Sequence, residues 1–231
     1  LELMKPIFGR ADFVAGNLET PACPFAPYRS EKVVIEQNFY CNAPREYLHA
    51  LKWAGIDMLT TANNHDMDTG AIGLGSTIDS LETCGFIHTG TFKDDRRRYE
   101  LIEINGIRIG IAAFTSGHNN LNKNLTKEGR TALLSGYRYE TAKALYTEMK
   151  TAGAEVAFAC MHWGTENSTA LSRNQLKCSK ELAEIGYDCV IGSHPHVLQE
   201  YAVIKGAEKD THVFYSLGNF LSHHFNNAKS R

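Results

Sequence analysis

The sequence predicts a layered α/β fold built around a mixed β-sheet. Short apolar runs alternate along the chain with longer stretches whose apolar residues recur at helical spacing. Two of the apolar runs flank Asn105-Gly106, the strongest hairpin signal in the chain, which predicts an antiparallel pair of strands. Polar residues follow five of the runs, an arrangement typical of the ligand-binding edge of an open α/β sheet.

The individual elements follow from local signals along the chain. One helix is expected to begin directly after Pro44, and the next to end at Gly85, because proline and glycine are typical start and stop residues. The Asn-rich stretch 117–136 shows no apolar periodicity, so it is expected to be a long functional or mobile loop. The predicted helices span 45–54, 71–84, 139–152 and 173–185, and the predicted strands span 12–15, 56–62, 99–104, 107–114, 155–161, 188–192, 201–204 and 212–217.

The composition excludes several classes of protein. With 24 Lys and Arg against 26 Asp and Glu, the formal charge of −2 offers no attraction to nucleic acid or to an anionic membrane. No apolar run approaches the roughly 18 residues of a membrane helix, so the visible chain is expected to be soluble. Six scattered cysteines without a C-x-x-C pair argue against a disulfide scaffold and a cysteine zinc site. Residues 1–231 are interpreted as one domain, because the sequence has no internal repeat and no low-complexity linker.

The polar residues that follow the five strands carry metal-binding chemistry. They are Asn17 and Glu19 after the first, Asn64, His65 and Asp68 after the second, His162, Trp163 and Glu166 after the third, His194 and His196 after the fourth, and Asn219 after the fifth. Imidazole and oxygen donors together suit Zn, Mn or Fe better than Ca or Mg. Two such ions roughly 3.5–4 Å apart would clamp a phosphoryl oxygen and generate hydroxide at neutral pH.

Each of these residues also has a structural interpretation. A single histidine at a strand end is often only a hydrogen-bonded loop residue, the Asn-Asn-His run suits a turn, and Trp163 suits a packing role. Their joint occurrence is what favours a metal site. The remaining groups are interpreted as structural or solvated: His88, His118, His212, His223, His224 and the run Arg96-Arg97-Arg98.

Five motifs together resemble one known family. They are Gly-Asn-Leu-Glu-Thr-Pro at 16–21, Ala-Asn-Asn-His at 62–65, His-Trp-Gly at 162–164, Gly-Ser-His-Pro-His-Val at 192–197 and Tyr-Ser-Leu-Gly-Asn-Phe at 215–220. In this order they resemble the bacterial capsule synthesis CapA (poly-γ-glutamate synthesis, PGA_cap) family, which is similar to calcineurin-like metallophosphoesterases. The resemblance implies a four-layer αββα sandwich with a dinuclear metal site.

The resemblance also implies a role for each strand-end residue. Asn64 corresponds to a metal-binding asparagine and His65 to the histidine that assists at the substrate. His162 resembles a lone metal ligand, and the pair His194 and His196 resembles the ligands that serve both metals. Glu19 stands where a bridging carboxylate is expected, although aspartate is usual there. Positions behind the ligands or facing the substrate are Asn17, Asp68, Trp163, Glu166 and Asn219.

The family's first strand, which ends in Gly-Asp, is not found in this sequence. Residues 1–10 contain neither a leading methionine nor a signal-peptide pattern, and they resemble the helix that follows that strand. We therefore expect residues to be missing upstream of Leu1. The localisation of the full-length protein, membrane-anchored or extracellular, is left open.

Two functions from different classes follow. The leading hypothesis is a hydrolase with two divalent ions (Mn, Fe or Zn), phosphoesterase-like and associated with capsule or poly-γ-glutamate biosynthesis. Its substrate would be an anionic polymer or a phosphoester. Its partners would be the subunits of a capsule synthesis complex, and nucleic acid would not be among them. The alternative is a non-catalytic polymer-binding or assembly subunit. A Ser-His-Asp hydrolase is disfavoured, because the chain has no G-x-S-x-G motif.

Overall fold

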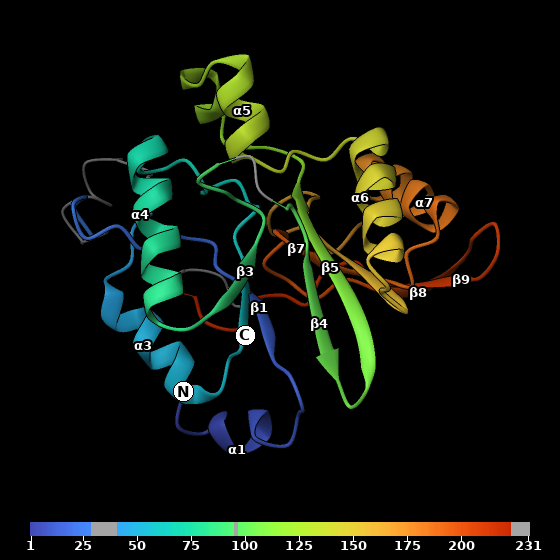
Figure 1. The fold of residues 1–231 in the computed structure, drawn as a ribbon, viewed down its shortest axis with the longest axis horizontal. Coiled ribbons are helices and arrows are strands. Elements are labelled where there is room, and N and C mark those ends of the chain that lie inside the picture. Colours follow the sequence, from blue (N-terminus) through green and yellow to red (C-terminus); the bar gives the residue numbers. More distant parts are fainter. Residues whose placement is uncertain (29–40, 95–96, 223–231) are drawn as a thin grey trace. The chain divides into compact units, whose positions relative to one another are not determined.

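The computed structural model describes residues 1–28, 41–94 and 97–222 (Figure 1). The chain forms two compact units, one of residues 1–98 and 117–135, the other of residues 99–116 and 136–231. Each unit has its own sheet and its own buried core. That the two act as one domain stays a prediction. The expectations for Arg96, His223 and His224 lie outside the described residues.

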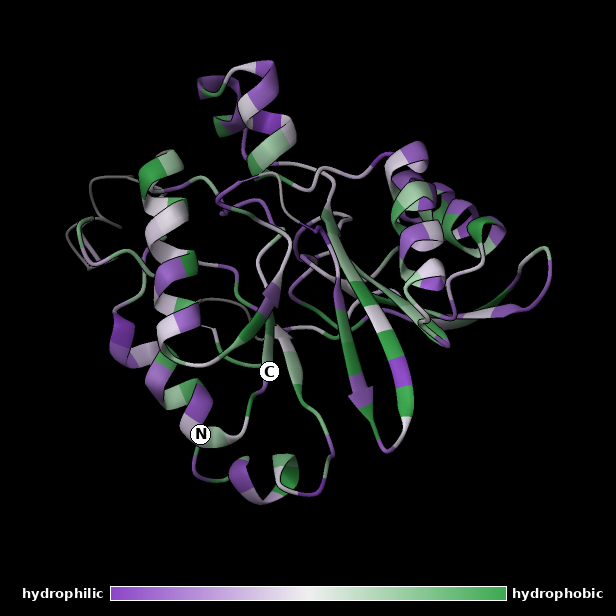
Figure 2. Cartoon of the chain, in the orientation of Figure 1, coloured by the Kyte–Doolittle hydropathy of each residue, from purple (hydrophilic) through white to green (hydrophobic). Residues whose placement is uncertain are grey.

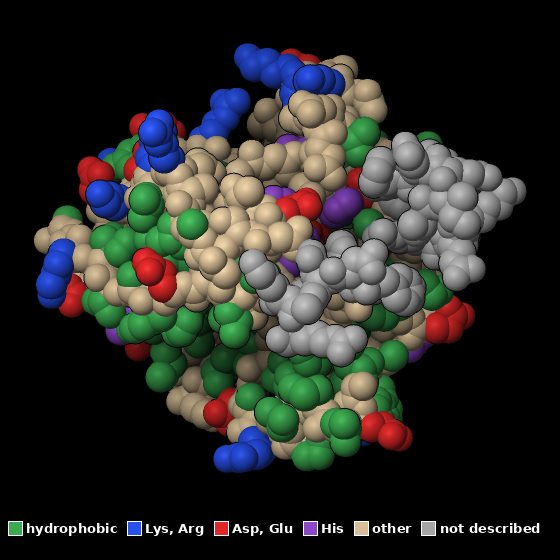
Figure 3. Space-filling view, turned by 180° about the vertical axis from the view of Figure 1, so that it is seen from behind, with side chains coloured by type: hydrophobic (Ala, Val, Ile, Leu, Met, Phe, Trp, Pro, Cys, Tyr) green, Lys and Arg blue, Asp and Glu red, His purple; other side chains and the backbone are tan. Residues whose placement is uncertain are grey.

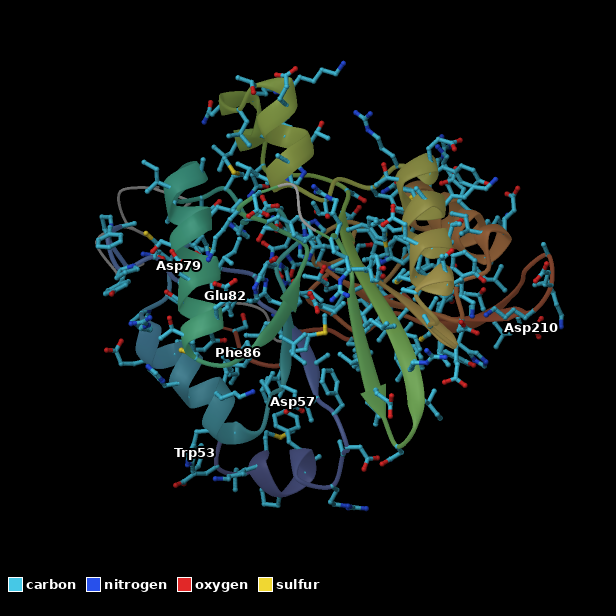
Figure 4. The ribbon with its side chains drawn as sticks, in the orientation of Figure 1. Trp53, Asp57, Asp79, Glu82, Phe86 and Asp210 are labelled. Carbon is cyan, nitrogen blue, oxygen red and sulfur yellow. The ribbon has the colours of Figure 1, made fainter. Side chains whose placement is uncertain are left out.

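The first unit contains a small parallel sheet. Its strands are β1 (Ala15–Asn17), β2 (Met58–Thr60) and β3 (Ile87–Thr89), in the order β1-β2-β3. Its helices are α1 (Lys5–Phe8), α3 (Arg45–Ala54), α4 (Gly70–Thr83), the 3₁₀ helix η1 (Leu121–Asn124) and α5 (Lys127–Leu133). Asp57, labelled in Figure 4, accepts a hydrogen bond of 2.8 Å from the backbone N–H of Val14. This bond connects the residues that directly precede β1 and β2.

Helix α3 shows how local sequence builds this unit. It begins after Pro44 and buries Leu48, Leu51 and Ala54, whose spacing puts them on one face. Gly55 ends the helix with a left-handed φ of 102°, a conformation that costs glycine little. Figure 2 shows the neighbouring helix α4 with hydrophilic and hydrophobic residues in alternation, as expected of a helix with one face on a core.

The stretch 117–136 was expected to be a loop, and that prediction is wrong. It contains η1 and α5, and the side chain of Thr126 caps α5 by accepting a hydrogen bond from the N–H of Gly129. At the other end, Arg98 donates to the carbonyl oxygens of Thr131 and Ala132 at 2.6 and 3.1 Å. The Thr126 cap is a local signal for this helix, whereas the contact with Arg98 joins segments far apart in sequence. Arg98 was expected to be solvated because it lies in a charged run. Instead its side chain binds these carbonyl oxygens.

The second unit contains a larger mixed sheet. Its strands are β4 (Glu100–Ile104), β5 (Ile107–Thr115), β6 (Val156–His162), β7 (Cys189–Ser193), β8 (Tyr201–Lys205) and β9 (Asp210–Phe214), in the order β4-β5-β6-β7-β9-β8. The central strands are parallel, and β4 and β8 are antiparallel edges. Helices α6 (Tyr139–Thr151) and α7 (Arg173–Ile185) pack on it. The class predicted from sequence, a mixed α/β fold, is confirmed.

The predicted hairpin is present in this unit. β4 and β5 pair antiparallel with Ile104 opposite Ile107, and Asn105 and Gly106 both have positive φ angles, 51° and 81°. These angles match the turn that Asn-Gly favours. Other strands are shifted from their predicted limits, since the strand expected at 12–15 forms instead at Ala15–Asn17, where it pairs with β2. The short strand β3 was not predicted.

The five strands followed by polar groups belong to two sheets rather than to one. β1 and β2 lie in the first unit, whereas β6, β7 and β9 lie in the second. The expectation of a single shared sheet edge is therefore wrong, because hydrogen-bond pairing divides the strands between the units. Stacking of the sheets into four layers stays a prediction. Within the described residues, no helix has both the length and the hydrophobicity that crossing a bilayer requires.

Candidate metal centre

The first unit brings together the residues that follow β1 and β2. The strands are parallel, so their carboxyl ends lie at the same sheet edge. Asn17 donates from Nδ2 to Oε2 of Glu19 at 3.3 Å. Asn63, which was not among the predicted site residues, donates from Nδ2 to the carbonyl oxygen of Leu18 at 2.8 Å and to Oδ1 of Asn17 at 3.4 Å. Asn63 thus ties the second predicted motif to the first.

His65 is held by two groups of its own turn. Its backbone N–H donates to Oδ1 of Asn63 at 3.0 Å, and its Nδ1 lies 2.7 Å from Oδ2 of Asp68. The Asp68 side chain is only 2% exposed, so this carboxylate is a buried partner for the ring. Burial by itself would lower the pKa of His65, but hydrogen bonds to Asp68 and Cys41 outweigh it and raise this pKa to about 10.

Asn64 contacts a distant segment of the same unit. Its Nδ2 donates to Oδ1 of Asn119 at 3.4 Å. Next to this contact, Nδ1 of His118 lies within 3.0 Å of both carboxylate oxygens of Asp66. Asn64 of the predicted motif and Asp66, two positions further on, are thus attached to two adjacent residues of the 117–136 stretch. His118 has the structural role that was expected, but its partner Asp66 was missed, because neither residue follows a local pattern.

A cysteine completes this part of the first unit. The backbone N–H of Cys41 donates to Oδ2 of Asp68 at 2.6 Å, the same oxygen that faces His65. The ligand atoms of Cys41, His65 and Asp68 all lie within 4.8 Å of one another. Cys41 lies outside the predicted motifs, so its position here was not expected.

The second unit gathers the predicted histidines. His162 is the last residue of β6 and pairs in register with Ser193, the last residue of β7. Nδ1 of His162 lies 3.0 Å from Oγ of Ser193. The ring centres of His162 and His194 are 4.7 Å apart, and those of His194 and His196 are 6.0 Å apart. Three of the four predicted strand-end histidines therefore form one group.

The loop after β7 has an unusual backbone. His194 and His196 both have positive φ angles, 96° and 60°. Non-glycine residues adopt such angles rarely and at a cost of about 1–3 kcal/mol, which the surrounding structure must offset. Strain of this kind is concentrated at functional sites.

Asn219 fixes the orientation of His196. Nδ1 of His196 lies 2.9 Å from Oδ1 of Asn219. An amide oxygen can only accept, so Nδ1 carries the proton of this hydrogen bond. The Nδ2 atom of Asn219 is buried without a hydrogen-bond partner among the described residues. One ligand atom each from exposed Glu166, His194 and His196 lies within 4.8 Å of the others.

Trp163 lies in the core of the second unit. Its side chain is completely buried, its Nε1 donates to the carbonyl oxygen of Tyr215 at 2.9 Å, and the two rings stack at 5.8 Å. Of the interpretations open from sequence, its burial favours packing behind His162 over contact with a substrate.

The donor chemistry of both units fits divalent ions. Each unit presents nitrogen and oxygen donors at the carboxyl ends of parallel strands, and hydrogen bonds from Ser193 and Asn219 orient the rings of the second unit. Such outer partners are typical of metal-binding histidines. The set suits Zn, Mn or Fe rather than Ca, which prefers oxygen alone.

Comparison with known proteins agrees with the motifs. The family model described as "Bacterial capsule synthesis protein PGA_cap" matches residues 1–224. "PGA biosynthesis protein CapA" of Bacillus subtilis (strain 168) is 27% identical over 223 residues, covering 95% of this chain and 56% of that protein. "Capsule biosynthesis protein CapA" of Bacillus anthracis is 30% identical over 223 residues, covering 94% and 52%. The chain thus spans about half the length of these relatives.

Solved structures show a similar fold. The NAD nucleotidase NadN of Haemophilus influenzae superposes with a TM-score of 0.52 at 16% identity, over 74% of this chain and 36% of that one. The calcineurin-like phosphoesterase YfkN from Bacillus subtilis gives a TM-score of 0.47 at 22% identity, over 73% and 52%. At these identities the likeness to NadN concerns the fold alone.

Proposed function

Because the chain belongs to the bacterial capsule synthesis PGA_cap family, we propose that it carries the centre of a metal-dependent, phosphoesterase-like hydrolase that acts in capsule or poly-γ-glutamate biosynthesis. The observation that carries the proposal is the histidine group at the ends of β6 and β7. His162, His194 and His196 are brought together there, and the last two have strained backbones. A packing role alone does not account for such a group.

Two divalent ions, Mn, Fe or Zn, are the cofactors in this proposal. The residues that would hold them are Glu19, Asn64, His162, His194 and His196. When bound, such a pair supplies Lewis-acid stabilisation of a phosphoryl oxygen and a nucleophilic hydroxide at neutral pH. Ser193 and Asn219 would contribute by holding the rings of His162 and His196 through their Nδ1 atoms.

His65 is the proposed proton donor or orienting group for the leaving oxygen. Asp68 holds its ring through Nδ1, so that Nε2 is the nitrogen left to face a substrate. Asn17 and Glu166 are proposed to contact the substrate or to support the ligands. Asn17 supports Glu19 directly, through the hydrogen bond between their side chains.

The substrate class is a phosphoester or an anionic polymer, and partners would be other subunits of a capsule synthesis complex. On the face seen in Figure 3, the described Lys and Arg side chains stand in separate small groups and form no continuous stripe. A long polyanion would thus find few fixed cations there. This observation places a small phosphoester first among the substrates to be tested.

The test measures bound metal and hydrolysis on the same preparations. Purified chain is loaded with Mn²⁺, its metal content is determined by elemental analysis, and hydrolysis of bis(p-nitrophenyl) phosphate and of poly-γ-glutamate is followed. We expect about two ions per chain and turnover that His65→Ala abolishes without loss of metal. Full function in a capsule assay with His65→Ala, together with unfolding of His162→Ala, would instead support the non-catalytic subunit.

A further inference from the structure

The Asn-rich stretch of the first unit begins with a tight turn. The backbone N–H of Leu121 donates to the carbonyl oxygen of His118 at 2.8 Å. The two residues between them, Asn119 and Asn120, both have left-handed backbones, with φ angles of 47° and 63°. Positive φ angles at both central positions are the mark of a type I′ turn, and asparagine is one of the few residues that adopt them readily. The Asn-Asn pair therefore builds this turn.

A buried contact fixes the first residue of the turn. His118 is only 8% exposed, and its Nδ1 lies 3.0 and 2.8 Å from the two carboxylate oxygens of Asp66. The side chain of Asp66 is completely buried, and both residues belong to the first unit. This anchor restricts where the next residue, Asn119, can place its side chain.

Asn119 lies against a proposed metal ligand. Its Oδ1 accepts a hydrogen bond of 3.4 Å from Nδ2 of Asn64, a residue that is only 7% exposed. A primary amide carries its oxygen and its NH₂ group on the same carbon, and of the two only the oxygen suits an ion such as Mn²⁺. If the Asn64 amide were flipped, its oxygen would face Oδ1 of Asn119, and two acceptors would meet. The contact therefore favours one of the two amide orientations.

We propose that Asn119 is a positioning residue that selects the metal-binding orientation of the Asn64 amide. This inference rests on the proposed function, in which Asn64 is one of the ligands. Removing the outer partner of a metal ligand typically weakens metal affinity by about 10–100-fold. Because the hydrogen bond is long and Asn119 is exposed, we expect an effect of about tenfold, at the lower end of this range.

The identity of the turn residues supports a role for the Asn119 side chain. Glycine adopts positive φ angles without steric cost, so it would serve the two central positions of this turn at least as well. The contact with Asn64 gives the amide of Asn119 a function that glycine could not supply. Asn120 differs, because its side chain makes no capping hydrogen bond to η1, the helix that it precedes.

Two glycine variants separate the side chain from the backbone. Asn119→Gly and Asn120→Gly each place glycine at a left-handed position of the same turn, so both should fold with thermal midpoints close to that of the wild-type chain. Isothermal titration with Mn²⁺ should give an affinity about tenfold weaker in Asn119→Gly and within about twofold of wild type in Asn120→Gly. Asn120→Gly is thus the matched control.

A conservative variant and a double variant test the contact with Asn64 directly. Asn119→Asp keeps an acceptor oxygen opposite Nδ2 of Asn64, so it should restore the Mn²⁺ affinity that Asn119→Gly loses. In an Asn64→Ala background no amide is left to orient, so Asn119→Gly should lower the affinity by less than about twofold further. A tenfold loss in that background would overturn the proposal, because Asn119 would then act on the metal by another route.

The hydrogen bond can also be observed without metal. In the ¹⁵N-labelled, metal-free chain, Asn119→Gly should shift the side-chain amide resonances of Asn64, whereas Asn120→Gly should leave them in place. Unchanged Asn64 resonances, or a loss of Mn²⁺ affinity in both glycine variants or in neither, would overturn the positioning role and leave the proposed metal centre intact. A wild-type chain that binds no Mn²⁺ would overturn both the positioning role and the proposed function.

Discussion

Nδ1 of His118 lies 3.0 and 2.8 Å from the two carboxylate oxygens of Asp66, and both side chains are almost completely buried. The residues are 52 positions apart in sequence. A second contact joins the same two segments, since Nδ2 of Asn64 donates to Oδ1 of Asn119 at 3.4 Å. The pair therefore attaches the 117–120 segment to the turn that carries a proposed metal ligand.

Breaking this pair should destabilise the chain strongly. Removing one partner of a buried hydrogen-bonded pair leaves polar atoms of the other with fewer hydrogen bonds, so we expect Asp66→Asn and His118→Ala each to cost about 1–3 kcal/mol of unfolding free energy. Urea unfolding measures this loss. Lys93→Ala breaks the exposed pairs with Asp79 and Glu82, the two carboxylates labelled in Figure 4, and should cost no more than about 1 kcal/mol. Equal losses at the two places would contradict the interpretation.

Asn219 should control metal affinity through His196. Asn219→Ala removes the acceptor that orients the ring, so we expect about a 10–100-fold weaker affinity for Mn²⁺ with little change in fold. Isothermal titration gives the affinity, and His196→Ala should have a larger effect. His212→Ala is the control, because His212 contacts Tyr201 on the β8–β9 hairpin at 2.6 Å. A drop in affinity in His212→Ala as large as that in Asn219→Ala would speak against the ligand assignment.

Cys178 should show a pH-dependent contribution to stability. Burial, with a further effect from Glu181, raises the pKa of its thiol from 9.0 to about 11. The unfolded chain therefore ionises this thiol first, so its contribution to stability is complete below pH 9.0 and declines between pH 9.0 and about 11. Cys178→Ala should flatten this decline in unfolding experiments. An unchanged slope in the variant would show that other groups are responsible.

Alkylation gives a second measure of the same thiol. In the folded chain, the iodoacetamide rate at Cys178 should stay low at pH 9 and rise only toward pH 11, because the thiolate is the reactive form. The same peptide in the denatured chain should react readily near pH 9. Identical profiles in the two states would contradict the burial effect.

Gly192 should tolerate no side chain. A Cβ atom there would lie 2.0 Å from the carbonyl oxygen of Tyr215 and 2.6 Å from Nε1 of Trp163, so Gly192→Ala must displace the core that supports His194. We expect loss of a cooperative thermal transition in the second unit. Gly75→Ala is the matched control, since its Cβ would meet nothing within 4 Å, and it should stabilise α4 by about 0.5–1 kcal/mol. A folded Gly192→Ala with unchanged unfolding would refute this account.

Elements whose signals are local could be predicted from the sequence. Helices α3 and α7 have the limits predicted, because Pro44 and Gly55 bound one, and Ser172 with Gly186 bound the other. The hairpin at Asn105-Gly106 follows from backbone preferences of two residues. The strand-end motifs also indicated the family, and the matching family model confirms it.

The grouping of the predicted residues needed the tertiary structure. The sequence shows polar groups after each of five predicted strands. That these strands belong to two sheets is seen only from the pairing between strands. Within the second unit, the parallel register of β6 and β7 brings His162 level with Ser193. The ligand roles remain predictions, although the residues named for them are grouped within each unit.

Contacts between residues far apart in the chain could not be predicted and are seen only in the folded structure. Helix α5 is completed by Arg98, Asp66 is paired with His118, and the backbone of Cys41 is anchored on Asp68. Periodicity, caps and turn residues report on neighbours within a few positions, because they act through backbone angles and the faces of single elements. These long-range contacts depend instead on which elements pack together, and that is settled only when burial, pairing and hydrogen bonding are satisfied at once.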